Sequence, residues 1–183
     1  MSDTPRLSRS LPNTPAAAPV RIVHLGIGNF HRAHQAWYTA HAPDAAQWGI
    51  AGFTGRRADM AEALGPQDGF YTLITRSADG DAFELVGALS AVHAAAEHDA
   101  YLDYLSRPEV AIVTITVTEA AYLRTPDGGL DASRDVVQRD LKALRKDPRA
   151  PVDSLPARLV AGLVARRSAG AAALTILSCD NLP

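Results

Sequence analysis

The chain has 183 residues, about the length of one ordinary domain. Apolar residues make up 47% of the chain, so it is expected to fold by burying a hydrophobic core rather than to stay disordered. The 18 basic and 20 acidic side chains nearly balance, which argues against a basic surface for nucleic acid or an anionic membrane.

Neither a disulfide nor a membrane span is expected. Cys179 is the only cysteine, so it forms no intramolecular disulfide and nothing requires an oxidising compartment. The most apolar run, residues 169–177, is about half of the roughly 20 residues that a membrane helix needs. Residues 1–19 are rich in Pro, Ser, Thr and Ala and lack the apolar stretch of a signal peptide, which indicates a flexible arm. We therefore expect a cytoplasmic protein.

The first expected element is a buried strand over residues 20–25, which stops at the turn Gly26-Ile27-Gly28. A helix over residues 30–42 follows, and Pro43 ends it. Residues 48–53 predict a second strand and residues 57–64 a short helix. Together these segments predict a strand-helix-strand unit.

The middle of the chain predicts an inserted hairpin and a central strand. Two β-rich runs, residues 70–74 and 83–86, flank the turn signal Asp79-Gly80. A helix is predicted over residues 99–105. Residues 110–117 are a continuous β-branched run without a polar face, so we place this strand in the centre of the sheet.

The last elements predicted are helices over residues 131–146 and 155–167 and a strand over 173–177. Strands that are apolar on both sides and alternate with helices indicate the α/β class, here a doubly wound, mostly parallel sheet with an inserted β-hairpin. We expect residues 20–183 to form one domain. Ligands of such sheets bind at the carboxyl ends of the strands.

The turn Gly26-x-Gly28 has the pattern that a dinucleotide site needs. The first glycine permits a tight turn, the second lets backbone amides approach the pyrophosphate, and a helix start adds partial positive charge. The third glycine of the usual fingerprint is replaced by His31. A plain turn with two glycines therefore stays an alternative interpretation.

Residues 26–35 read Gly-Ile-Gly-Asn-Phe-His-Arg-Ala-His-Gln, and this run resembles the signature of the mannitol dehydrogenase family. These polyol-specific long-chain dehydrogenases interconvert sugar alcohols or aldonates with ketoses or keto acids. Residues 67–73, residues 116–119 with Tyr122, and residues 174–183 resemble further blocks of the family in the same order. The resemblance covers nearly all of the chain after its first 19 residues.

The resemblance implies a zinc-independent enzyme with a Rossmann-type N-terminal domain and a mostly helical C-terminal domain. The chain is expected to end inside the first domain, so that alone it should have little or no activity. Of the catalytic residues, only Asn181 has a counterpart here, and it resembles the asparagine that stabilises the developing alkoxide. Without the resemblance, a polar cap or turn before Pro183 would be the preferred interpretation of Asn181.

Binding of NAD, with NADP as the other option, is assigned to a short list of residues after the first two strands. Asp59 is the candidate for the adenosine ribose hydroxyls, whereas Arg56 and Arg57 could meet the 2′-phosphate of NADP. A helix-start acid with solvated arginines is the alternative. The residues assigned to the turn and the helix start are Gly26, Ile27, Gly28, Asn29, Phe30, His31 and Arg32.

Thr118, after the central strand, is the candidate for the nicotinamide half of the cofactor, although β propensity alone explains the threonines before it. His31, His34 and His41 lack the cysteine or carboxylate that would complete a metal site, so no metal is expected. Cys179 is interpreted as a packing residue.

Three functions stay open. The first is the nucleotide-binding part of an oxidoreductase that moves hydride between a nicotinamide cofactor and a polyol, ketose or sugar acid. The second is a non-catalytic dinucleotide-binding module or truncated product, and the third is an α/β scaffold that binds no nucleotide. Self-association is expected if the surface around Asn181 and residues 155–167 is left uncovered.

Overall fold

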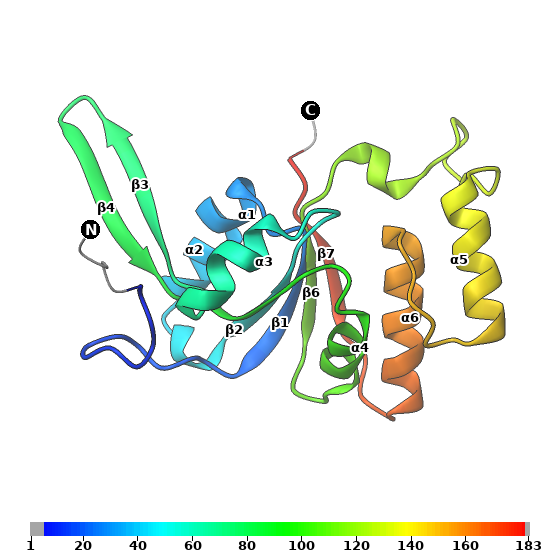
Figure 1. Cartoon of the computed structure of the whole chain (residues 1–183), viewed down its shortest axis with the longest axis horizontal. Coiled ribbons are helices and arrows are strands. Elements are labelled where there is room, and N and C mark those ends of the chain that lie inside the picture. The colour runs from blue at the N-terminus through cyan, green and yellow to red at the C-terminus, as the bar shows by residue number, and fades with distance from the viewer. Residues whose placement is uncertain (1–5, 182–183) are drawn as a thin grey trace. The chain divides into compact units, whose positions relative to one another are not determined.

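The computed structural model describes residues 6–181, so the ends of the predicted arm and of the last sequence block lie outside the described residues (Figure 1). The chain divides into two compact units, Met1–Ala95 and Ala96–Pro183.

Three parallel strands in the order β5-β2-β1 form the centre of the first unit. The strands are β1 (Val20–Leu25), β2 (Gly49–Phe53) and β5 (Leu89–His93). β2 is buried along its whole length because it pairs with β1 on one side and β5 on the other. The strand β5 has no counterpart among the sequence predictions.

The predicted helix over residues 30–42 is divided into α1 (Asn29–Ala33) and α2 (Gln35–Ala40). The break falls at His34, whose backbone angles are φ −121° and ψ −89°. Its ring nitrogen Nδ1 lies 2.8 Å from the Phe30 carbonyl oxygen, which also accepts the His34 amide at 3.0 Å. The ring and the amide of His34 thus share one acceptor at the break.

The helix α3 (Asp59–Leu64) follows β2, and the predicted hairpin is confirmed as β3 (Tyr71–Ser77) and β4 (Gly80–Val86). The hairpin projects from the sheet of the first unit (Figure 1). Glu84 attaches it to α2, because this carboxylate accepts from Trp37 Nε1 at 2.9 Å and lies 3.0 Å from His41 Nε2.

The described part of the predicted arm contacts the base of the hairpin. The Arg9 guanidinium donates to the carbonyl oxygens of Gly87 and Leu89, each at 2.9 Å, and lies 4.5 Å above the Phe70 ring. The Arg9 amide donates to Asp68 Oδ2 at 2.8 Å. Arg9 therefore connects the start of the chain to segments about 60 to 80 positions later.

The second unit contains two parallel strands, β6 (Ile112–Ile115) and β7 (Thr175–Ser178). Its helices are α4 (His98–Ser106), α5 (Asp135–Lys146) and α6 (Leu155–Ser168), with a short 3₁₀ helix, η3 (Glu119–Tyr122), after β6. The structure thus shortens the strand predicted over residues 110–117 and starts the helix predicted from residue 131 four positions later. Among residues 6–181, no helix is both long and apolar enough to cross a membrane.

Packing of α4 against α6 depends on a glycine. A Cβ atom at Gly162 would lie 2.6 Å from the Tyr101 hydroxyl oxygen, closer than real contacts allow. Tyr101 is fully buried, and burial raises the pKa of its hydroxyl. Gly162 therefore lets the two helices approach around this ring.

Candidate functional site

The turn after β1 is attached to the end of β2. Gly26 has φ 108°, a left-handed conformation that favours glycine. The amides of Gly26 and Ile27 both donate to the Phe53 carbonyl oxygen, at 2.9 and 3.2 Å. The carboxyl ends of β1 and β2 are thereby held together, where a parallel sheet binds its ligands.

Gly28, at the start of α1, differs from Gly26 because the fold does not require a glycine there. Its φ of −135° and ψ of −173° are extended angles that any residue adopts. A Cβ atom at this position would meet only the Gly26 carbonyl oxygen, at an ordinary distance of 3.8 Å. The missing side chain leaves the backbone edge of the turn open to a close ligand.

Arg32 places a positive charge beside this turn. Its guanidinium donates through Nε to the Gly28 carbonyl oxygen at 3.3 Å and through Nη2 to Asn29 Oδ1. Tyr71 supports it from β3, since its hydroxyl donates to the Arg32 carbonyl oxygen at 2.6 Å and its ring lies 5.6 Å from the guanidinium carbon. Burial raises the pKa of Tyr71, so the hydroxyl stays a donor.

Two stacked histidines lie beneath the turn. His24 on β1 and His31 on α1 have ring centroids 3.4 Å apart and planes 13° apart, and both residues are fully buried. Burial lowers the pKa of His31 well below its usual value, and His24 and Arg32 lower it further. His31 is therefore a neutral packing residue that connects α1 to the sheet.

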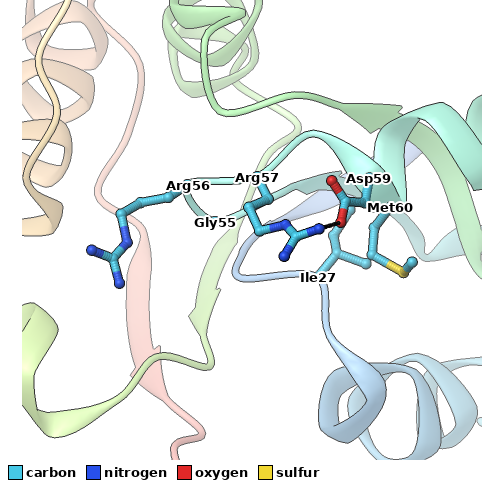
Figure 2. Close-up of a pocket in the computed structure, with 6 residues that line it drawn as sticks. All are labelled: Ile27, Gly55, Arg56, Arg57, Asp59 and Met60. Carbon is cyan, nitrogen blue, oxygen red and sulfur yellow. Dashed lines mark ion pairs between the residues drawn. The ribbon is translucent and has the colours of Figure 1, made fainter.

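An open pocket of about 320 Å³ lies after β2, and Figure 2 shows its lining residues. Arg57 Nη2 lies 2.5 Å from Asp59 Oδ2 in an exposed ion pair at the pocket. Arg56 extends away from this pair. The lining residues are Ile27, Gly55, Arg56, Arg57, Asp59 and Met60, so the pocket combines the first turn with the acidic and basic residues predicted after the second strand.

The other two predicted site residues, Thr118 and Asn181, belong to the second unit, and both are exposed. Thr118 precedes the 3₁₀ helix η3. Asn181 follows Asp180, whose carboxylate accepts the Val117 amide at 2.6 Å and the Ser178 hydroxyl at 2.7 Å. The role of Asp180 was not predicted from the sequence, because its partners come from segments far apart in the chain.

No group of three or more metal-ligating side chains occurs in the part of the chain that the structure describes. The rings of His31, His34 and His41 have different surroundings. The ring of His31 stacks on His24, whereas His34 contacts the Phe30 carbonyl oxygen through Nδ1. His41 contacts the Trp37 carbonyl oxygen and Glu84.

The chain is similar in sequence to known proteins over almost its whole length. The sequence profile of the mannitol dehydrogenase Rossmann domain matches residues 20–183. The chain belongs to the mannitol dehydrogenase family. Membership confirms the family resemblance, and it shows that the chain corresponds to the Rossmann domain of these enzymes.

Among relatives in the mannitol dehydrogenase family, the mannitol 2-dehydrogenase of Cereibacter sphaeroides is 38% identical over 168 residues. The polyol:NADP oxidoreductase of Gluconobacter oxydans is 38% identical over 170 residues. In both cases the match covers 88% of this chain but 34% of the relative. The chain therefore spans about a third of the length of these oxidoreductases.

A solved structure of the same family confirms the predicted fold class. The Pseudomonas fluorescens mannitol 2-dehydrogenase, solved as a ternary complex with NAD and D-mannitol, superposes with a TM-score of 0.77 at 34% identity. The match covers 91% of this chain and 34% of that one. The chain is thus a Rossmann-type α/β domain with parallel strands and an added antiparallel hairpin.

Proposed function

We propose that the chain is the nicotinamide-dinucleotide-binding part of an oxidoreductase that transfers hydride between the cofactor and a polyol, ketose or sugar acid. The observation that carries this proposal is the turn at Gly26 and Gly28. Gly28 leaves the backbone edge open although the fold would accept a side chain there, and Arg32 supplies positive charge beside it. Both properties suit a pyrophosphate.

In this proposal, the residues of the turn and the residues of the pocket bind different parts of the cofactor. The backbone of Gly26 to Gly28 and the side chain of Arg32 bind the pyrophosphate, and Ile27 packs below the adenosine half. Asp59 accepts hydrogen bonds from the adenosine ribose. Asn29, Phe30 and His31 act through the shape and attachment of α1.

The second unit supplies the groups for the reacting end. When bound, the nicotinamide ring accepts or donates the hydride. We assign Thr118 to hold the nicotinamide half, and the side-chain amide of Asn181 to donate a hydrogen bond to the alkoxide that develops on the substrate. Both side chains are exposed, so they are accessible to a ligand.

We propose that both NAD and NADP bind, because the residues that line the pocket include an acid, Asp59, and two arginines, Arg56 and Arg57. Asp59 suits the free ribose hydroxyls of NAD, whereas Arg57 can turn from Asp59 to the 2′-phosphate of NADP. The ion pair between them is exposed, so breaking it costs little. The related polyol:NADP oxidoreductase is consistent with this choice.

We expect the choice of substrate and the rate of turnover to depend on the part of the longer relatives that this chain does not match. Our proposal keeps residues 20–183 as the nucleotide-binding domain and expects the residues that choose the polyol to lie beyond the matched region. The chain by itself should therefore bind cofactor with little or no turnover, which is also the behaviour of a non-catalytic module. The cytoplasmic location stays a prediction.

The test is a fluorescence titration of the chain with NADH, using two glycine variants. Gly28→Ala should fold like the parent, because its Cβ has space and its angles are ordinary, but should weaken NADH binding by about tenfold or more. Gly65→Ala is the matched control, since a Cβ there meets no atom within 4 Å. A folded parent that does not bind NADH, or a Gly28→Ala variant that binds like the parent, would refute the proposal.

A further inference from the structure

The carboxylate of Asp180 joins three segments of the second unit. Its Oδ1 accepts the Val117 amide at 2.6 Å, and its Oδ2 accepts the Ser178 hydroxyl at 2.7 Å and the Tyr122 hydroxyl. The hydroxyl oxygens of Tyr122 and Ser178 lie 3.2 Å apart. One side chain therefore connects the residues after β6, the end of η3 and the end of β7.

These contacts continue the pairing of β6 and β7 beyond its last backbone bonds. Ile115 pairs with Ser178 at the end of the ladder, and the Cys179 amide donates to the Ile115 carbonyl oxygen at 2.8 Å. The next amide donor on the β6 side, that of Val117, is taken by the side chain of Asp180 rather than by backbone. The carboxyl ends of the two strands are thus held together where ordinary pairing stops.

The segment between Val117 and Tyr122 is attached to Asp180 at both of its ends. Val117 binds through its amide and Tyr122 through its hydroxyl, and η3 lies between them. Burial and the neighbouring Asp180 carboxylate raise the pKa of Tyr122, so the hydroxyl remains a donor at neutral pH. A loop with two fixed ends has fewer conformations to lose when it binds a ligand.

Thr118 lies inside this closed segment, directly after Val117, and Asn181 directly follows Asp180 in the chain. Of the two residues assigned above to the reacting end of the cofactor, Thr118 is therefore one position from a contact of this carboxylate and Asn181 is one position from Asp180 itself. Leu123 then adopts a left-handed conformation, with φ 52°, immediately after Tyr122. The geometry of the segment is defined on both sides.

We propose that Asp180 is a positioning residue for the nicotinamide half of the site, which it orders by holding the loop that carries Thr118 against the strand end that carries Asn181. This inference rests on the proposed function. It predicts a role for Asp180 in binding the nicotinamide end and none in binding the adenosine end, whose residues come from the first unit.

The first measurement is amide hydrogen exchange of the uniformly ¹⁵N-labelled chain. Protection of the Val117 amide should be lost in Asp180→Ala and partly restored in Asp180→Asn, because the amide oxygen of asparagine can still accept from Val117. Asp147→Ala is the matched control, since Asp147 also accepts a backbone amide, that of Arg149, but lies between α5 and α6. Equal Val117 protection in all variants would refute the proposed contact.

The second measurement compares the affinities of the chain for NADH and for ADP-ribose, which lacks the nicotinamide ring. Asp180→Ala should weaken NADH binding by about tenfold, the effect expected for losing hydrogen bonds to a charged group, and leave ADP-ribose binding unchanged. Asp180→Asn should recover part of the NADH affinity. Tyr122→Phe removes only the hydrogen bond from the Tyr122 hydroxyl to Asp180 and should weaken NADH binding by about threefold. This variant replaces Asp180→Ala in the experiment if Asp180→Ala does not fold.

The outcomes separate this inference from the proposed function. If the parent chain binds neither NADH nor ADP-ribose, the proposed function fails and the positioning role fails with it. If the parent binds both and the variants at Asp180 and Tyr122 leave the ratio of the two affinities unchanged, the positioning role is refuted while the proposed function stands. A selective loss of NADH binding with partial rescue by asparagine supports the role.

Discussion

At the scale of single residues, the exposed ion pair of Arg57 and Asp59 is the part of the proposed site that we expect to determine cofactor choice. The two side chains lie 2.5 Å apart at the pocket, so each competes with the ligand group that the other would bind. In the proposed site, Asp59 would repel the 2′-phosphate of NADP and Arg57 would attract it. The sequence shows both residues, and the structure adds that they contact each other.

Replacing Arg57 and replacing Asp59 should therefore shift the preference between NADH and NADPH in opposite directions. Arg57→Ala should weaken NADPH binding by about tenfold and leave NADH binding near the parent value, while Asp59→Asn should strengthen NADPH relative to NADH. Fluorescence titrations with both cofactors measure these changes. Arg76→Ala, on the hairpin, is the control for loss of a surface arginine. Parallel changes in both affinities would show that the pair does not select the cofactor.

The buried pair of His24 and His31 is a second feature that acts at residue scale. Because burial lowers the pKa of His31 well below its value of 6.5 in the unfolded chain, the unfolded state binds more protons as the pH falls. The free energy of unfolding should thus be highest above pH 6.5 and should fall as the solution is acidified below it.

Substituting His31 by Phe should reduce this pH dependence, because the ring that stacks on His24 is kept and the titrating group is removed. One such proton accounts for at most about 1.4 kcal/mol per pH unit. Urea unfolding at several pH values from 5 to 8 measures the slope. His98 also has a pKa lowered by burial, so a smaller slope is expected in the variant rather than none. Identical slopes would contradict the assignment.

At the scale of elements, the start of the chain and the hairpin depend on each other. Arg9 donates to the carbonyl oxygens of Gly87, between β4 and β5, and of Leu89, the first residue of β5. Its amide donates to Asp68, before β3. The amide of Arg9 and the hydroxyl of Ser8 lower the pKa of Asp68. The two ends of the inserted hairpin are therefore held by one short N-terminal segment.

Arg9→Ala should lower the free energy of unfolding of the first unit by about 2 kcal/mol. Two carbonyl oxygens lose a charged donor, and the Phe70 ring loses its cation–π contact with the guanidinium. Chemical denaturation followed by tryptophan fluorescence measures the change. Arg6→Ala is the control, since Arg6 is exposed three positions earlier. Equal stabilities of the two variants would mean that the arm does not support the hairpin.

At the scale of the whole molecule, the chain leaves large apolar side chains exposed on the second unit. Val160 and Leu163, on one face of α6, are 52% and 42% exposed, and Ile176 and Leu177 on β7 are 42% and 49% exposed. Apolar surface of this kind is often covered by another chain or domain. The relatives extend well beyond the matched third of their length.

We expect the chain to self-associate through the exposed apolar face of α6 that carries Val160 and Leu163. The mass measured by light scattering should rise with concentration, and the double variant Val160→Glu with Leu163→Lys should shift the equilibrium toward the monomer. Lys146→Glu, an exposed charge change on α5, is the control. A parent chain that stays monomeric at all concentrations would contradict this expectation.

The sequence by itself determined the features that depend on neighbouring residues. The strand β1, the glycine turn and the hairpin were predicted because burial patterns, glycine spacing and turn residues act over a few positions. The same local run, residues 26–35, led to the family, which comparison with known proteins confirms. Thr118, Asn181 and the other assigned site residues stay predictions.

Only the tertiary structure decided the features whose partners are distant in the chain. The strand β5 pairs with β2, and no periodicity within residues 89–93 shows that pairing. Asp180 meets Val117 across 63 positions, and the His24 and His31 rings stack because α1 folds back on β1. Such contacts depend on how strands and helices are brought together, which local patterns in the sequence do not encode.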